Sequence, residues 1–227
     1  MKVLVVQNRM GIGDMVIFLP YIEAISKHFS VPISLLVKEN TKCSEYLSDN
    51  PNIDNIIILD RNDKKKLGKH YGLKGIFNLA SEIKKYNFDK IFIFNSSFRY
   101  TIVAKLAKIE NVYQYKLFNK KNQNIIETAK TFLKKTLNVE IESNPIISVD
   151  SKKVTDAKSK YQIIDSEINI LLGVGGSGLT KRVSPEKFIE LMNFCSNKFK
   201  CKFFLAAGSN DIEEKIVNQI LNSEHKN

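Results

Sequence analysis

The chain has 227 residues, of which 43% are hydrophobic and 26% charged, and its 35 Lys and Arg residues outnumber its 24 Asp and Glu residues. This composition excludes an intrinsically disordered chain, and no stretch approaches the roughly 20 consecutive apolar residues that a membrane-spanning helix needs. The formal net charge of +11 favours anionic partners, and it leaves open nucleotide diphosphates, phosphorylated glycolipids, acidic membranes and nucleic acid.

The cysteines and the amino terminus indicate the compartment. Cys43, Cys195 and Cys201 have neither the spacing of metal ligands nor the dense, even pattern of a disulfide scaffold. The first eight residues lack the long apolar core and the small-residue cleavage site of a signal peptide. We therefore expect a cytoplasmic protein. The three histidines are scattered, so no metal site is expected.

Short β-branched runs alternate with longer amphipathic segments in the first part of the chain. This alternation is typical of β-α-β units and predicts an α/β fold with a mainly parallel sheet that helices cover on both faces. The expected strands are residues 2–7, 32–37, 55–59, 89–94 and 111–115, the expected helices are residues 15–29, 41–48, 76–86, 98–108 and 125–137, and residues 61–74 form a polar loop.

The apolar periodicity weakens between residues 140 and 166, which predicts a boundary between two units. We expect a first domain at residues 1–150, a connection at 151–166 and a second domain at 167–227. The second domain is expected to be incomplete, because about 60 residues are roughly half the size of a common domain. Its expected strands are residues 168–174 and 202–206, and its expected helices are 185–199, capped by Ser184, and 211–221, capped by Asn210.

The first strand runs into a glycine-containing turn, RMGIGD, at residues 9–14. Gly11 and Gly13 allow a tight turn and a close approach of the backbone to a ligand. With Glu39 they resemble a dinucleotide-binding fingerprint, but Val16 stands where the third glycine belongs. Asp14 either caps the following helix by accepting backbone N–H bonds or accepts a proton from a substrate, and the sequence leaves both open.

A second glycine-rich turn, GVGGSG at residues 173–178, precedes Thr180, Lys181 and Arg182. Backbone N–H groups and two cations in such a segment can converge on one phosphate group. It is not the P-loop of nucleotide triphosphatases, because Lys181 does not directly follow the last glycine. The alternative is an exposed loop with solvated charges.

Several segments occur in a specific order: GIGD at residues 11–14 with Leu19-Pro20, NPNID at 50–54, FDK at 88–90 with Phe98-Arg99, and KRVSPEKF at 181–188. Together they resemble the ADP-heptose lipopolysaccharide heptosyltransferases of glycosyltransferase family 9, over nearly the whole chain. The resemblance implies the GT-B architecture of two facing Rossmann-like domains. The first would hold mainly the sugar acceptor and the second mainly the nucleotide-sugar donor.

The resemblance also implies an inverting, metal-independent reaction without a cofactor, and the sequence has no Asp-x-Asp triplet for a cation on the diphosphate. Asp14 would be the general base, and Lys181 would bind the donor diphosphate and stabilise its departure. The implied donor-binding residues are Gly175, Gly176, Thr180, Lys181 and Arg182, and the implied acceptor-binding residues are Gly11, Gly13 and Arg99.

The implied partners are an ADP-sugar and a phosphorylated lipopolysaccharide core, with peripheral contact to the anionic inner membrane and no nucleic acid. The chain departs from the family in Val183, where an aromatic residue is usual, and it ends before the family's nucleotide-binding Asp-x-Gly-x-x-His segment. Two alternatives are an NAD-dependent nucleotide-sugar oxidoreductase, which Gly11, Gly13 and Glu39 favour, and a truncated module that binds without catalysis.

Overall fold

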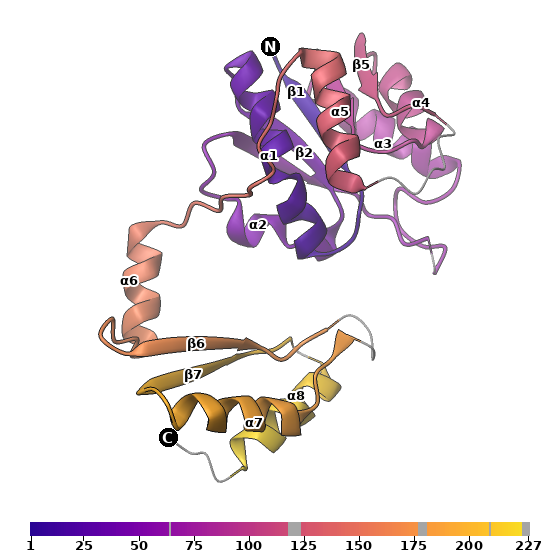
Figure 1. Cartoon of the computed structure of the whole chain (residues 1–227). Helices are drawn as coiled ribbons and strands as arrows, with labels where there is room; N and C mark the ends of the chain where they lie inside the picture. The colour runs from indigo at the N-terminus through magenta and orange to yellow at the C-terminus, as the bar shows by residue number, and fades with distance from the viewer. Residues whose placement is uncertain (64, 118–123, 177–180, 209, 224–227) are drawn as a thin grey trace. The chain divides into compact units, whose positions relative to one another are not determined.

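The computed structural model describes residues 1–63, 65–117, 124–176, 181–208 and 210–223, and it divides into two compact units, Met1–Asp150 and Ser151–Asn227 (Figure 1). The first unit contains a five-stranded sheet. Its strands are β1 (Val3–Gln7), β2 (Ile33–Val37), β3 (Ile53–Ile58), β4 (Lys90–Ile93) and β5 (Asn111–Gln114), in the order β3-β2-β1-β4-β5. All four pairings are parallel, which confirms the predicted parallel sheet.

The helices of the first unit are α1 (Ile12–Phe29), η1 (Glu39–Thr41), α2 (Cys43–Tyr46), α3 (Lys74–Lys84), α4 (Phe98–Leu106) and α5 (Ile125–Leu137). α1 and α5 pack on one face of the sheet, and α3 and α4 pack on the other. Successive side chains of a strand point to opposite faces. Val3 and Val5 of β1 therefore join the first core and Leu4 and Val6 the second, so the predicted burial on both faces is confirmed.

The strand order positions the candidate site. From β1 the chain passes through α1 to β2 on one side, whereas β4 pairs with β1 on the other side. The connections that leave β1 and β4 thus diverge, and in open parallel sheets ligands bind at this point, outside the carboxyl ends of the strands. Residues 8–14 and 94–98 lie there.

The second unit contains α6 (Ser151–Lys160), the parallel strands β6 (Ile168–Gly173) and β7 (Cys201–Ala206), and the helices α7 (Pro185–Ser196) and α8 (Asp211–Leu221). Ser184 and Asn210 occupy the predicted N-cap positions of α7 and α8. A small core joins the strands to both helices and consists of Leu172, Val174, Phe188, Met192, Ile216 and Ile220.

The sequence prediction missed some elements. The connection expected at 151–166 contains the helix α6, which buries no residue and therefore has no apolar stripe to reveal it. The helix expected at 41–48 is wrong in part, because Lys42 has a left-handed backbone with φ 55° that separates η1 from α2. None of the helices among the described residues is long and apolar enough to cross a membrane.

Candidate functional site

A buried glutamine holds the turn that follows β1. Gln7 is 1% exposed, its Oε1 accepts the backbone N–H of Arg9 at 2.8 Å, and its Nε2 donates to the backbone carbonyl of Asp14 at 3.3 Å. Both ends of the turn are thus tied to one side chain. Gly11, the N-cap of α1, has φ 100°, a conformation that an L side chain rarely adopts. Sequence reasoning did not single out Gln7, whose signal is a polar residue at the end of an apolar strand.

Asp14 lies in the first turn of α1, at the carboxyl edge of the sheet. Its side chain is half-buried, and its carboxylate makes no hydrogen bond or ion pair with any residue that the structure describes. The capping alternative is therefore not realised in the structure. Beside it, a Cβ added to Gly13 would meet no atom within 4 Å, so the space next to the carboxylate is open.

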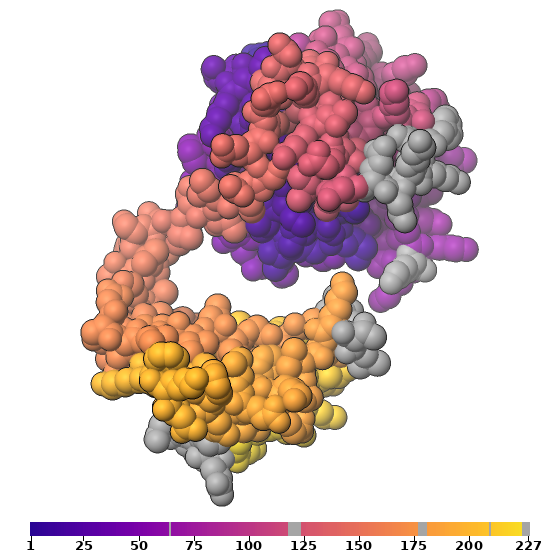
Figure 2. Space-filling view, in the orientation of Figure 1, coloured from indigo at the N-terminus to yellow at the C-terminus, as the bar shows by residue number. Residues whose placement is uncertain are grey.

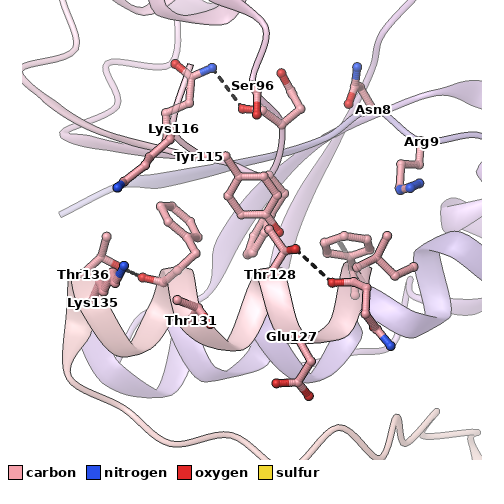
Figure 3. Close-up of a pocket in the computed structure, with 17 residues that line it drawn as sticks. Asn8, Arg9, Ser96, Tyr115, Lys116, Glu127, Thr128, Thr131, Lys135 and Thr136 are labelled. Carbon is pink, nitrogen blue, oxygen red and sulfur yellow. Dashed lines mark hydrogen bonds between the residues drawn. The ribbon is translucent and has the colours of Figure 1, made fainter. Parts of the chain in front are cut away.

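A pocket of about 760 Å³ opens at the carboxyl ends of β1, β4 and β5 and along α5 (Figure 3). Arg9 lies at one end of it and Lys116 and Lys135 at the other. None of these three cations pairs with a carboxylate among the described residues. The floor is aromatic, with edge-to-face contacts among Phe18, Phe94, Tyr115 and Phe132. Such a lining suits a ligand with a ring and an anionic group.

Two buried polar atoms of this pocket lack a partner within the described part of the chain: the Tyr115 hydroxyl and the Asn95 Nδ2. Burial raises the pKa of Tyr115, so the hydroxyl keeps its proton at neutral pH. Buried polar groups in proteins are usually hydrogen-bonded. These two atoms are therefore available to a ligand.

Arg99 has a different environment from that expected of an acceptor-binding residue. Its guanidinium donates to the carbonyl of Gly72 at 2.9 Å and to the carbonyl of His70, so it ties the start of α4 to the segment before α3. Burial, and then the neighbouring Arg61, lower its pKa. Arg99 does not line the pocket beside Arg9.

In the second unit, one carboxylate bridges the loop that follows β6 and the loop that follows β7. Glu213, in the first turn of α8, is 6% exposed and accepts the backbone N–H of Gly176 at 3.3 Å and that of Gly208 at 2.5 Å. Hydrogen bonds from Asn210 and from the N–H groups of Gly208 and Gly176 hold the pKa of Glu213 below its usual range. A Cβ at Gly175 would lie 2.7 Å from this carboxylate, so a side chain there would displace the Glu213 carboxylate.

The predicted donor residues are brought together in part. Arg182 donates its Nε–H to the carbonyl of Gly176 at 3.1 Å, and a Cβ at Gly176 would lie 2.9 Å from the carbonyl oxygen of Lys181. Lys181 itself is exposed and has no ion pair or hydrogen bond to a described residue. Thr180 lies outside the described residues. Glu213 was not predicted, because only folding places α8 against this turn.

In the described parts of the chain, no group of three or more His, Cys, Asp or Glu side chains could hold a metal ion. Tyr86 and Lys90 have the Tyr-x-x-x-Lys spacing of some oxidoreductases, but they lie where β4 begins. That is the edge of the parallel sheet opposite to Gly11 and Asp14.

No protein-family profile and no curated protein matches the chain, whereas solved structures do. The glycosyl transferase family 9 protein from Veillonella parvula DSM 2008 superposes with a TM-score of 0.74 at 19% identity, over 98% of this chain and 67% of that one. The fold is that of the family 9 glycosyltransferases.

Two further structures with the family 9 fold come from E. coli. The ADP-heptose lipopolysaccharide heptosyltransferase II gives a TM-score of 0.67 at 16% identity, over 97% of this chain and 68% of that one. The heptosyltransferase WaaC with ADP-2-deoxy-2-fluoro heptose gives 0.66 at 12% identity, over 98% and 74%. Each of these matches covers nearly the whole of this chain.

Proposed function

We propose that the chain is an inverting, metal-independent glycosyltransferase that moves a heptose or a related sugar from an ADP-sugar to a phosphorylated lipopolysaccharide core. The single observation that carries the proposal is the half-buried Asp14 carboxylate, unpaired among the described residues, at the carboxyl end of β1 in a family 9 fold. The E. coli neighbour that holds an ADP-heptose analogue supports the class of donor.

In this reaction Asp14 is the general base. Its carboxylate removes the proton of an acceptor hydroxyl while that oxygen attacks the anomeric carbon of the donor sugar. The bond from the anomeric carbon to the diphosphate breaks, and ADP leaves with the electron pair. Because attack and departure occur on opposite faces of the carbon, one displacement inverts its configuration. A positioned base of this kind contributes roughly 10²–10⁴-fold to the rate.

The leaving ADP gains negative charge that must be stabilised. The exposed Lys181 ammonium supplies a cation next to the glycine turn, while Arg182 and Glu213 hold that turn from both sides. Glu213 thus acts as a positioning residue for Gly175 and Gly176 and does not itself touch the phosphates. Preorganised donors aimed at developing charge are worth roughly 10²–10³-fold each.

The pocket beside β1, β4 and β5 is proposed to receive the acceptor. Its aromatic floor can pack against a sugar ring, and Arg9, Lys116 and Lys135 can meet phosphate groups. A lipid-linked acceptor places the enzyme in the cytoplasm, in peripheral contact with the anionic inner face of the membrane. Next to Asp14, a Cβ added at Gly13 would meet no atom within 4 Å.

Two measurements test the proposal. ADP binding to the chain by calorimetry should weaken about tenfold or more in Lys181→Ala, because hydrogen bonds between charged groups contribute about 1.5–3 kcal/mol. Lys187→Ala is the matched control, since Lys187 is exposed on α7 and pairs with Glu190. Equal ADP affinity in both variants would contradict the donor site.

Release of ADP from ADP-heptose in the presence of a phosphorylated core acceptor tests the base. Asp14→Asn should lower kcat by roughly 10²–10⁴-fold and leave ADP affinity unchanged. Asp211→Asn alters a first-turn aspartate of α8 and serves as the control. Normal turnover in Asp14→Asn would eliminate the general-base role.

A further inference from the structure

Three large apolar side chains stand exposed between β3 and the second turn of α3. Leu67 is 62% exposed, Leu73 80% and Phe77 62%. Isolated apolar side chains are common on protein surfaces, but several that lie together mark an interaction site. The segment's purple atoms project from one edge of the first unit in Figure 2.

Hydrogen bonding folds this segment onto α3. Leu73 and Phe77 are four residues apart at the start of the helix, so their side chains are neighbours on its outer face. Asn78 donates its Nδ2–H to the carbonyl of Lys69 at 2.9 Å, which holds the chain just after Leu67 against the same first turns. The segment that carries Leu67 is therefore tied to the first turns of α3, which carry Leu73 and Phe77.

Three exposed lysines are chain neighbours of Leu67 and Leu73. Lys65, Lys66 and Lys74 are exposed, and none of them has a carboxylate within ion-pair distance among the described residues. Lys69, in contrast, pairs with Glu82. An apolar surface with unpaired lysines is complementary to a lipid bilayer, whose interior is apolar and whose head groups can be negatively charged.

A second exposed apolar area, on the outer face of α7, differs in that the lysines near it interact with other residues of the chain. Phe194 is 57% exposed, but Lys198 lies over its ring at 4.1 Å. Lys187 of the same helix pairs with Glu190 at 3.0 Å. Lys187 and Lys198 are therefore engaged within the chain, whereas Lys65, Lys66 and Lys74 have no carboxylate partner among the described residues.

We propose that this surface docks the first unit on an anionic lipid bilayer. It is called the α3 patch and consists of Leu67, Leu73 and Phe77 with Lys65, Lys66 and Lys74. The apolar side chains enter the head-group region, and the lysine ammonium groups lie against lipid phosphates. This assignment rests on the membrane contact of the proposed function and names the surface that makes it. Vesicle binding requires neither donor nor acceptor, so it can succeed or fail independently of sugar transfer.

The contribution of each side chain to membrane affinity determines how large an effect its substitution should have. Burial of one Phe or Leu side chain corresponds to roughly tenfold or more in affinity. Each lysine at an anionic surface corresponds to roughly fivefold, and this part weakens as salt screens the charges. Loss of Phe77 and loss of two lysines should therefore each be measurable alone.

The experiment measures co-sedimentation of the chain with phosphatidylcholine vesicles that contain either no or one third phosphatidylglycerol. Wild type should bind the anionic vesicles and lose this binding as salt rises. Phe77→Ser should weaken binding about tenfold or more, and Lys65→Gln combined with Lys66→Gln similarly. Phe194→Ser, the matched exposed phenylalanine, should bind as wild type, and thermal melting should confirm that all variants are folded.

Three results would overturn the proposal: no binding of wild type to anionic vesicles, equal binding of Phe77→Ser and wild type, or equal loss in Phe77→Ser and Phe194→Ser. A parallel titration uses a labelled single-stranded RNA. Binding to the RNA but not to vesicles would assign the lysines to nucleic acid and would also overturn it. Vesicle binding with no ADP binding would leave docking intact and contradict only the transferase.

Discussion

Replacing Gln7 with leucine tests whether a buried amide positions the turn that carries Asp14. Leucine keeps similar volume and apolar packing but removes the bonds to the Arg9 N–H and the Asp14 carbonyl. Each hydrogen bond contributes about 0.5–1.5 kcal/mol net, so the variant should lose about 1–3 kcal/mol in the free energy of unfolding.

The assay combines urea unfolding, amide hydrogen exchange and turnover. Protection of the Arg9 amide should fall about tenfold, since 1.4 kcal/mol changes an equilibrium tenfold. Ser26→Ala is the matched control, because buried Ser26 donates to the Val31 carbonyl at 2.7 Å and contacts Asn52, away from the site. Both variants should lose stability, but only Gln7→Leu should lower Arg9 protection and kcat.

The positioning role of Gln7 would be refuted by a Gln7→Leu variant that is destabilised like Ser26→Ala and yet keeps the Arg9 protection and the turnover of wild type. In that case the turn would owe its shape to Gly11 and to the packing of α1 alone. Lower kcat with unchanged protection would equally contradict it, since the amide then acts by some other route.

Three further predictions concern two glycine positions and the titration of His70. Gly11→Ala should cost about 1–3 kcal/mol in urea unfolding because φ is 100°, whereas Gly13→Ala, with open space around it, should leave stability unchanged or raise it by up to about 1 kcal/mol; equal values would contradict the strain at Gly11. Gly175→Ala should weaken ADP binding in calorimetry because its methyl group meets the Glu213 carboxylate, while Gly173→Ala, with no atom within 4 Å, should not. Burial lowers the pKa of His70 below 6.5, so the unfolded chain binds the proton more readily; stability should be complete above about pH 6.5 and fall as the pH drops below it. In urea unfolding at pH values above and below 6.5, His70→Gln should lessen this dependence, and an unchanged slope would exclude His70 as its source.

The parallel sheet was predictable because its signal is local. A strand buried on both faces must be apolar at nearly every position, and β1, β2 and β4 meet that demand. The strand lengths, the glycine turns and the caps at Ser184 and Asn210 follow from the same local rules. Helix α6 was missed since a helix with no buried residue carries no apolar period.

The sequence alone singled out Asp14 and Lys181 as candidates, because each stands beside a glycine-containing turn and occurs in a segment that resembles the family 9 glycosyltransferases. Only the tertiary structure decided how they are held: Gln7 under the first turn, Glu213 between the N–H groups of Gly176 and Gly208, and Arg99 on the carbonyls of the segment before α3. These hydrogen bonds join residues up to 37 positions apart in the case of Glu213 and Gly176. Their partners are backbone atoms, which every residue has, so no pattern of side chains can reveal them before the chain has folded.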